Sequence, residues 1–130
     1  MQTLLAVAAG GAIGASARYL LSREVARWFG SGFPWGTLAV NVLGAAAMGL
    51  LIGLFARVWP VQDPWRAFLT TGILGGFTTF SAFSLEASLM IERGPYLHAA
   101  AYAVASVVLC LAALLGALWL TRALPAGLPS

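Results

Sequence analysis

Polar side chains gather in a stretch of this sequence that is otherwise apolar enough to cross a lipid bilayer. Between Gly72 and Ser84 it reads GILGGFTTFSAFS, with three glycines that can relax a helix and four hydroxyl side chains. Its phenylalanines recur at every third position, so they share roughly one helical face; they are Phe77, Phe80 and Phe83. Irregular backbone at membrane depth is tolerated only where protein buries it or water lines it, and its freed carbonyls commonly coordinate ions. The stretch therefore predicts an ion site.

Three further polar side chains interrupt apolar segments. The amide of Asn41 must find partners inside a membrane, either as a helix–helix hydrogen bond or as a donor aimed into a pore. Arg18, at the end of the first apolar run, either reaches the membrane surface or draws anions to a pore mouth. Glu86 lies towards the end of its segment, where an acid is ordinarily solvated.

The composition places the whole chain in a membrane. Of its 130 residues 61% are hydrophobic and 8% charged, whereas a soluble domain carries about 25% charged residues. Since a spanning helix takes about 20 residues, the length allows four spans but no additional soluble catalytic domain. The lone Cys110 permits no internal disulfide and offers no metal cluster.

Four helices must position these polar groups. The predicted spans are residues 3–21, 35–55, 66–91 and 96–120, which make residues 1–130 one all-α transmembrane domain whose third helix is broken. The first run lacks the basic start of a signal peptide, so we expect a retained helix. Small residues at helical spacing, Gly10 with Gly14 and Gly49 with Gly53, predict close helix approach. Residues 22–34 are expected to form a short segment at the membrane surface.

The basic residues are balanced between the two sides of the membrane. All seven are arginines, and four spans would place Arg57, Arg66 and Arg122 on one side and Arg23, Arg27 and Arg93 on the other. Because orientation follows the Lys/Arg bias, both orientations should insert, and two inverted copies could pair. Arginines scattered singly in this way do not form a nucleic-acid-binding surface.

Three sequence blocks resemble the signatures of the Fluc (CrcB) fluoride channels. They are GGAIGASARY at residues 10–19, GTLAVNVLG at 36–44 and GGFTTFSAFS at 75–84. The third block is highly specific, the second fairly so, and the first would be weak alone. Length, span number and block order also match, so the resemblance covers nearly the whole chain.

The resemblance implies a dual-topology, antiparallel homodimer in a bacterial inner membrane that passively exports fluoride. It also implies a structural sodium ion on the dimer axis, held by the backbone carbonyls of Gly75 and Thr78 from both chains. The implied pore residues are Asn41, Thr79, Phe80, Ser81, Phe83, Tyr102 and Ser106, and the implied vestibule residues are Arg18 and Glu86. The choices of fluoride over chloride and of sodium over potassium rest on the resemblance.

Two positions depart from the family pattern. Ala82 stands where many members carry Thr or Ser, and Cys110 stands where a hydroxyl residue is common. Tyr102, Ser106 and Cys110 follow each other at four-residue steps, so they form a weakly polar line along one helix face. Such a line also suits simple helix packing, which stays open as an alternative.

Other classes of membrane protein fit the sequence less well. A proton-coupled drug exporter would need a carboxylate deep in a span, and the first span contains no acid. A structural subunit would leave the broken third span without a purpose. An intramembrane enzyme would need a catalytic set of His, Ser or Asp residues within the spans, and His98 is the only histidine. We therefore expect a channel rather than an enzyme.

Overall fold

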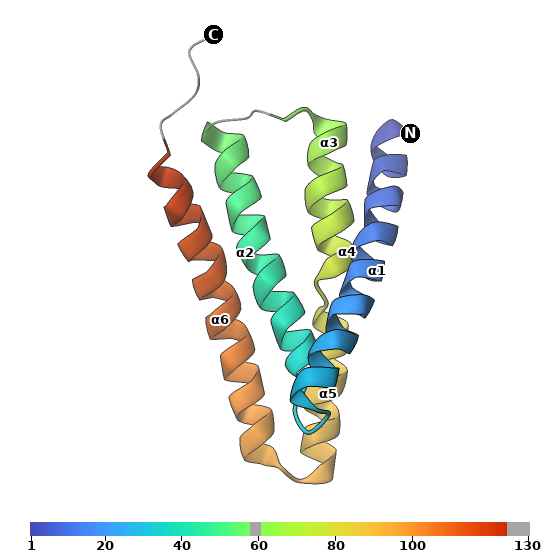
Figure 1. The fold of residues 1–130 in the computed structure, drawn as a ribbon, viewed down its shortest axis with the longest axis vertical. Helices are drawn as coiled ribbons and strands as arrows, with labels where there is room; N and C mark the ends of the chain where they lie inside the picture. The colour runs from blue at the N-terminus through green and yellow to red at the C-terminus, as the bar shows by residue number, and fades with distance from the viewer. Residues whose placement is uncertain (58–60, 125–130) are drawn as a thin grey trace.

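The computed structural model describes residues 1–57 and 61–124, and its helices traverse the molecule four times (Figure 1). The helices are α1 (Gln2–Phe29), α2 (Trp35–Arg57), α3 (Asp63–Ala67), the π-helix η1 (Phe68–Leu74), α4 (Gly75–Phe77), α5 (Phe80–Arg93) and α6 (Tyr96–Arg122). Four segments are long and apolar enough to span a membrane, and the third is Asp63–Arg93, which runs from α3 to α5. The predicted all-helical, four-span architecture with a broken third span is confirmed.

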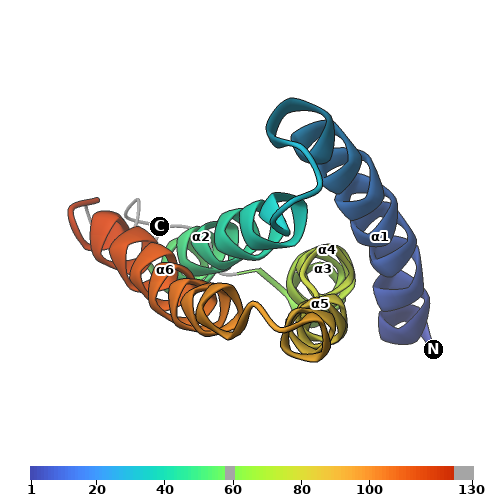
Figure 2. The same ribbon diagram turned by 90° about the horizontal axis from the view of Figure 1, so that it is seen from below.

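The third span changes its neighbour at the break. Before the break in the chain, α3, η1 and α4 pack against α1, whereas after it α5 packs against α6. Viewed along the helices, α1 and α6 lie at opposite sides with α2 and the third span between them (Figure 2). Within the described residues α1 and α6 do not touch. The third span therefore packs against α1 before the break and against α6 after it.

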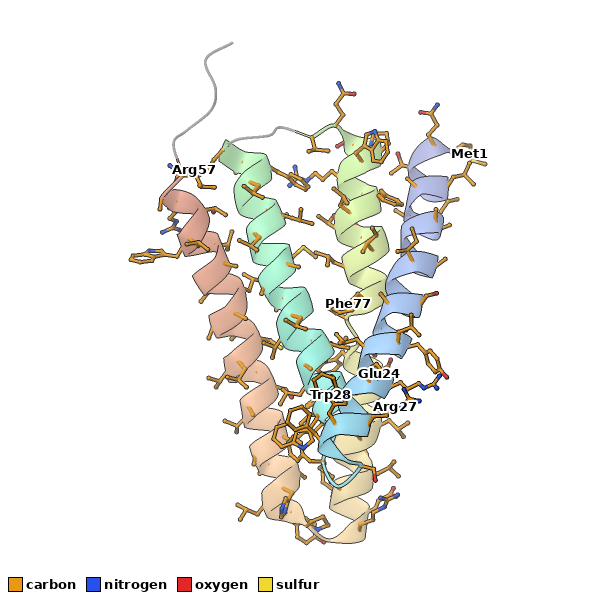
Figure 3. The ribbon with its side chains drawn as sticks, viewed as in Figure 1. Met1, Glu24, Arg27, Trp28, Arg57 and Phe77 are labelled. Carbon is orange, nitrogen blue, oxygen red and sulfur yellow. The ribbon has the colours of Figure 1, made fainter. Side chains whose placement is uncertain are left out.

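The first helix is longer than its apolar run. It was predicted to end at residue 21, with residues 22–34 as a separate surface segment, but α1 continues to Phe29 and Gly30 ends it with φ 80°. An ion pair one turn apart, Arg27 to Glu24 at 2.8 Å, supports the extension, and both side chains lie low on α1 in Figure 3. The prediction was wrong because it took the end of the hydrophobic pattern as the end of the helix.

Glycines bring α1 into backbone contact with the third span. A Cβ atom on Gly14 would lie 2.8 Å from the backbone nitrogen of Phe77, and one on Gly76 would lie 2.7 Å from the carbonyl of Gly11. A Cβ on Gly10 would likewise lie 2.9 Å from the Cα of Gly72. The predicted close approach through Gly10 and Gly14 is confirmed. Gly72 and Gly76, expected to loosen the helix, instead make room for this contact.

Replacing Gly14 by valine should strongly destabilise the protomer. The new side chain would meet the backbone of Ile73 and Phe77, which cannot turn aside as a flexible side chain can. Overpacking of this kind should cost roughly 3 kcal/mol. Gly11→Ala is the matched control, because nothing lies within 4 Å of a Cβ there. Thermal unfolding in detergent should show a large loss for the first variant and none for the second; equal stability would contradict the packing.

The second small-residue stripe joins α2 to α6. A Cβ on Gly49 would lie 2.9 Å from that of Ala117, and Gly53 faces the buried Thr121. At the end of this pair the Arg57 guanidinium donates to the Arg122 carbonyl over 2.8 Å, which caps the last turn of α6 (Figure 3). The α2–α6 pair thus packs together on one side of the bundle, and α1 packs with the first part of the third span on the other.

Candidate ion site at the broken third span

The break itself consists of two threonines. Thr78 (φ −77°, ψ 157°) and Thr79 (φ −153°, ψ 117°) are extended, and helix resumes at Phe80. Extended backbone suits β-branched residues, so no glycine is needed there. The break is thus narrower than the predicted stretch between Gly72 and Ser84, and a π-helix precedes it.

Asn41 of α2 pairs with the backbone of the break. Its Nδ2 donates to the Thr79 carbonyl over 2.9 Å, and its Oδ1 accepts from the Thr79 amide at 2.7 Å. One side chain thereby satisfies both backbone groups of Thr79. A primary amide has two N–H donors, and this pairing uses one of them.

The same hydrogen bonds release the carbonyls of Gly75 and Thr78. In an unbroken helix these would accept from the amides of Thr79 and Ala82. Instead, the Thr79 amide donates to Asn41, and the Ala82 amide donates to the Thr79 hydroxyl over 3.1 Å. Ala82 departs from the family pattern in its side chain. The hydrogen bond at this position is made by its backbone N–H, so it does not depend on that side chain. The break therefore frees two hard carbonyl oxygens from their helical donors.

Arg18 lies beside this break. Its Nη1 donates a hydrogen bond to the Thr78 carbonyl over 3.5 Å, so that carbonyl has a side-chain donor in the protomer. Because α1 continues to Phe29, Arg18 stands inside the helix rather than at its end. A positive charge is therefore present next to the freed carbonyls at the level of the break.

The three phenylalanines of this stretch lie in two different places, one before the break and two after it. Phe77, before the break, points towards α2, where a Cβ on Gly44 would lie 3.2 Å from its ring (Figure 3). The Phe80 and Phe83 rings, after the break, lie 5.2 Å apart. The expectation that all three share one face is wrong, because the extended residues turn the chain between Phe77 and Phe80.

An open cleft of about 480 Å³ adjoins the break, and we call it the phenylalanine cleft. Its lining includes Asn41, Thr79, Phe80, Phe83, Ser106 and Cys110. Ser106 is 9% exposed, and its hydroxyl is without a hydrogen-bond partner in the part of the chain that the structure describes. Cys110 is half-buried in the same wall. The Ser106 hydroxyl can therefore donate a hydrogen bond to an acceptor that is not part of the protomer.

Ser81 and Tyr102 complete the group of predicted pore residues. The Ser81 hydroxyl lies 3.2 Å from that of Thr79, at the start of α5. Tyr102 is fully buried, and its ring centroid is 5.0 Å from that of Phe83. The structure thus brings Asn41, Thr79, Phe80, Phe83 and Ser106 to one cleft, whereas Ser81 and Tyr102 lie next to its lining and not in it.

Glu86 is not the solvated terminal acid that its position suggested. Its carboxylate accepts a hydrogen bond from the Tyr102 hydroxyl and another from the Thr37 hydroxyl, each 2.7 Å long. Thr37 was missed as a site residue, although its spacing of one helical turn from Asn41 places both on one face of α2. Glu86 and Thr37 also line a second cavity of about 340 Å³, which we call the mouth cavity.

These features define a class: a multi-pass membrane protein whose third span breaks at a polar site beside a half-open cleft. Comparison with known proteins narrows this class. The family described as "CrcB-like protein, Camphor Resistance (CrcB)" matches residues 5–118.

Bacterial relatives match almost from end to end. A "Fluoride-specific ion channel FluC" of Phenylobacterium zucineum is 56% identical over 123 residues, 94% of this chain and 97% of the relative. Proteins of the same name from Rhodospirillum centenum and Sphingopyxis alaskensis are 52% and 51% identical, over 94% and 97% of this chain and 97% and 100% of theirs. The chain belongs to the CrcB family and is a multi-pass bacterial membrane protein. Its relatives are named as ion channels, so the expectation that it is not an enzyme is confirmed.

Proposed function

We propose that this chain forms a fluoride-selective channel that lets fluoride leave the cell passively. Support comes from the relatives, which are named fluoride-specific ion channels. The single observation that carries the proposal is the phenylalanine cleft, which is lined by two phenylalanine rings, by Asn41 and by Ser106, whose hydroxyl lacks a partner among the described residues. These groups offer partial positive charge and hydrogen-bond donors without a full cation.

Such weak donors suit a small, strongly hydrated anion. Ring edges of phenylalanine carry partial positive charge, and hydroxyl and amide groups donate hydrogen bonds that can replace water. Conduction requires sites that hold the ion well enough to enter yet release it again. An arginine within the cleft would bind too firmly, whereas Arg18 beside the break draws anions towards it.

Fluoride release from liposomes tests this function. Purified protein in liposomes loaded with potassium fluoride should release fluoride once valinomycin lets potassium follow, as an ion-selective electrode would record. Chloride loaded in the same way should stay inside. Equal release of both anions, or retention of both, would refute the proposal.

We further propose an antiparallel homodimer as the conducting form. In the isolated protomer Phe80 is 77% exposed and Gly75 is also exposed, so a residue with a freed carbonyl and a cleft residue both lie at the surface. An inverted copy would close this side. Both ends of the bundle carry arginines. Arg57, Arg66 and Arg122 lie at the end where α1 begins and α6 ends (Figure 1), and Arg27 and Arg93 lie at the other end, so neither orientation is favoured.

A structural sodium ion fits the two carbonyls that the break releases. Those of Gly75 and Thr78 lose their helical donors, and hard oxygen ligands suit a hard alkali cation. We propose that these carbonyls from both copies hold the ion. When bound, it would offset the repulsion between carbonyls that converge in a dry interface.

Gly75→Val should abolish the dimer while sparing the protomer. Within the protomer a Cβ on Gly75 meets only the Thr70 carbonyl at 3.7 Å, an ordinary contact, so any severe effect must come from the partner. Gly116→Val on α6 is the control, because a Cβ there has open space. Crosslinking and efflux should fail only in the first variant, and Thr78→Ser should be tolerated. A fully active Gly75→Val dimer would exclude this interface.

A further inference from the structure

Two sulfur-containing side chains line the phenylalanine cleft, and the proposed function uses neither of them. Met48 comes from α2 and Cys110 from α6, and both are half-buried. Cys110 is the only cysteine of the chain, and it is one of the two positions that depart from the family pattern. The cleft therefore has a chemical feature that is particular to this chain.

The packing of α2 on α6 brings the two side chains to nearby levels of the bundle. The two helices run in the same direction (Figure 1), and a Cβ on Gly49 would lie 3.1 Å from the carbonyl carbon of Leu114. Cys110 is one turn before Leu114, about 6 Å along the helix. Side chains on a helix lean towards its N-terminus, so Met48, next to Gly49, extends back towards the level of Cys110.

A buried polar group without a partner lies one turn from Cys110. Ser106 is 9% exposed and lines the same cleft, and its hydroxyl has no hydrogen-bond partner among the described residues. Buried polar groups are ordinarily satisfied, so this hydroxyl indicates that water or a ligand occupies the cleft at its level. Cys110 lies on the same face of α6 and borders the same space.

The chemistry of the two sulfurs defines the ligand. Thiolate and thioether sulfurs select soft metal ions such as copper(I). In the part of the chain that the structure describes, no three His, Cys, Asp or Glu side chains come together, so a site of the kind that zinc prefers is not formed. We propose, on the basis of the proposed fluoride channel, that Cys110 and Met48 bind a soft monovalent metal ion, copper(I) or silver(I), which blocks the cleft to fluoride.

Binding of such an ion leaves the cleft without a net charge. Silver displaces the thiol proton, so Ag⁺ and the Cys110 thiol give a silver thiolate and H⁺, and the Met48 sulfur donates a lone pair to the same ion. The thiolate cancels the charge of the metal, which avoids the cost of an unpaired ion away from water. The bound ion lies within about one turn of Ser106, so it covers a hydroxyl that the proposed function offers to fluoride.

Silver inhibition of fluoride efflux tests this site. Liposomes loaded with potassium fluoride, in nitrate rather than chloride because silver chloride precipitates, should release fluoride more slowly as silver nitrate is added. Each variant is compared with its own rate without silver. Cys110→Ser should raise the half-inhibiting silver concentration about a hundredfold and Met48→Leu about tenfold, since loss of a group that supports a metal site costs roughly 10–100-fold in affinity.

Met90→Leu is the matched control for the thioether. Met90 lies on α5 and lines the mouth cavity instead of the phenylalanine cleft, so its replacement should leave the half-inhibiting silver concentration unchanged. Native mass spectrometry gives a second readout that needs no transport. Purified Cys110→Ser protein should bind one silver ion fewer per chain than the wild type.

The outcomes separate the metal site from the channel. Equal silver sensitivity of the wild type and Cys110→Ser, including no inhibition of either, or equal silver content of the two, would overturn the metal site. Fluoride release without silver would still support the channel in that case. A wild type that binds silver through Cys110 but releases no fluoride would instead refute the channel and leave the sulfur site in place.

Discussion

Replacing Phe80 or Phe83 by isoleucine should reduce fluoride efflux about tenfold or more per ring, an effect of the size of one aromatic edge interaction. Isoleucine keeps apolar bulk but removes the polarised ring edge. The two rings lie 5.2 Å apart and line the same cleft, so each should contribute. Phe80 is 77% exposed in the protomer, so its loss should leave the fold intact.

Phe29→Ile is the matched control for this prediction. Phe29 ends α1, is 64% exposed, packs its ring at a tilt against Trp35, and does not line the phenylalanine cleft. Efflux from liposomes, with dimer content checked by crosslinking, should fall in the two cleft variants and not in the control. Wild-type efflux in Phe80→Ile and Phe83→Ile would mean that these rings are packing and not pore.

Asn41→Asp should destabilise the protein and stop efflux together. The aspartate loses the donor to the Thr79 carbonyl and places a negative oxygen against it, while this backbone is part-buried. Leaving a buried group unsatisfied costs about 1–3 kcal/mol, and more beside a charge, so we expect a loss of roughly 3 kcal/mol. Chemical denaturation in detergent measures this loss.

Asn41→Gln provides the comparison for the aspartate variant. It keeps the amide but moves it by one methylene, so it should be less damaging than Asn41→Asp in both stability and efflux. If Asn41→Asp had the same free energy of unfolding as the wild type, the paired hydrogen bonds to Thr79 would not stabilise the extended conformation at the break.

The sequence was sufficient to predict features that depend on hydrophobic length and small-residue spacing. Four apolar runs predicted four spans, and the polar residues between Gly72 and Ser84 predicted the break. Gly10 and Gly14 predicted close approach because a stripe of glycines serves little else in a membrane helix.

Features set by pairing between distant residues were not predictable. Whether Thr79 is extended depends on Asn41, which lies 38 residues away. Glu86 looked like a terminal acid because its partners, Thr37 and Tyr102, come from two other helices. The π-helix η1 and the extension of α1 to Phe29 likewise follow from packing and an ion pair rather than from a hydrophobic period.

The reversal potential of single-channel current is the most direct measure of whether the protein conducts fluoride and rejects chloride. Purified protein in a planar bilayer would face a fluoride gradient with equal chloride on both sides. We expect the current to reverse at the fluoride equilibrium potential, because the cleft should pass fluoride and reject chloride. Reversal at zero, where chloride is at equilibrium, or a bilayer that stays silent with protein present, would contradict it.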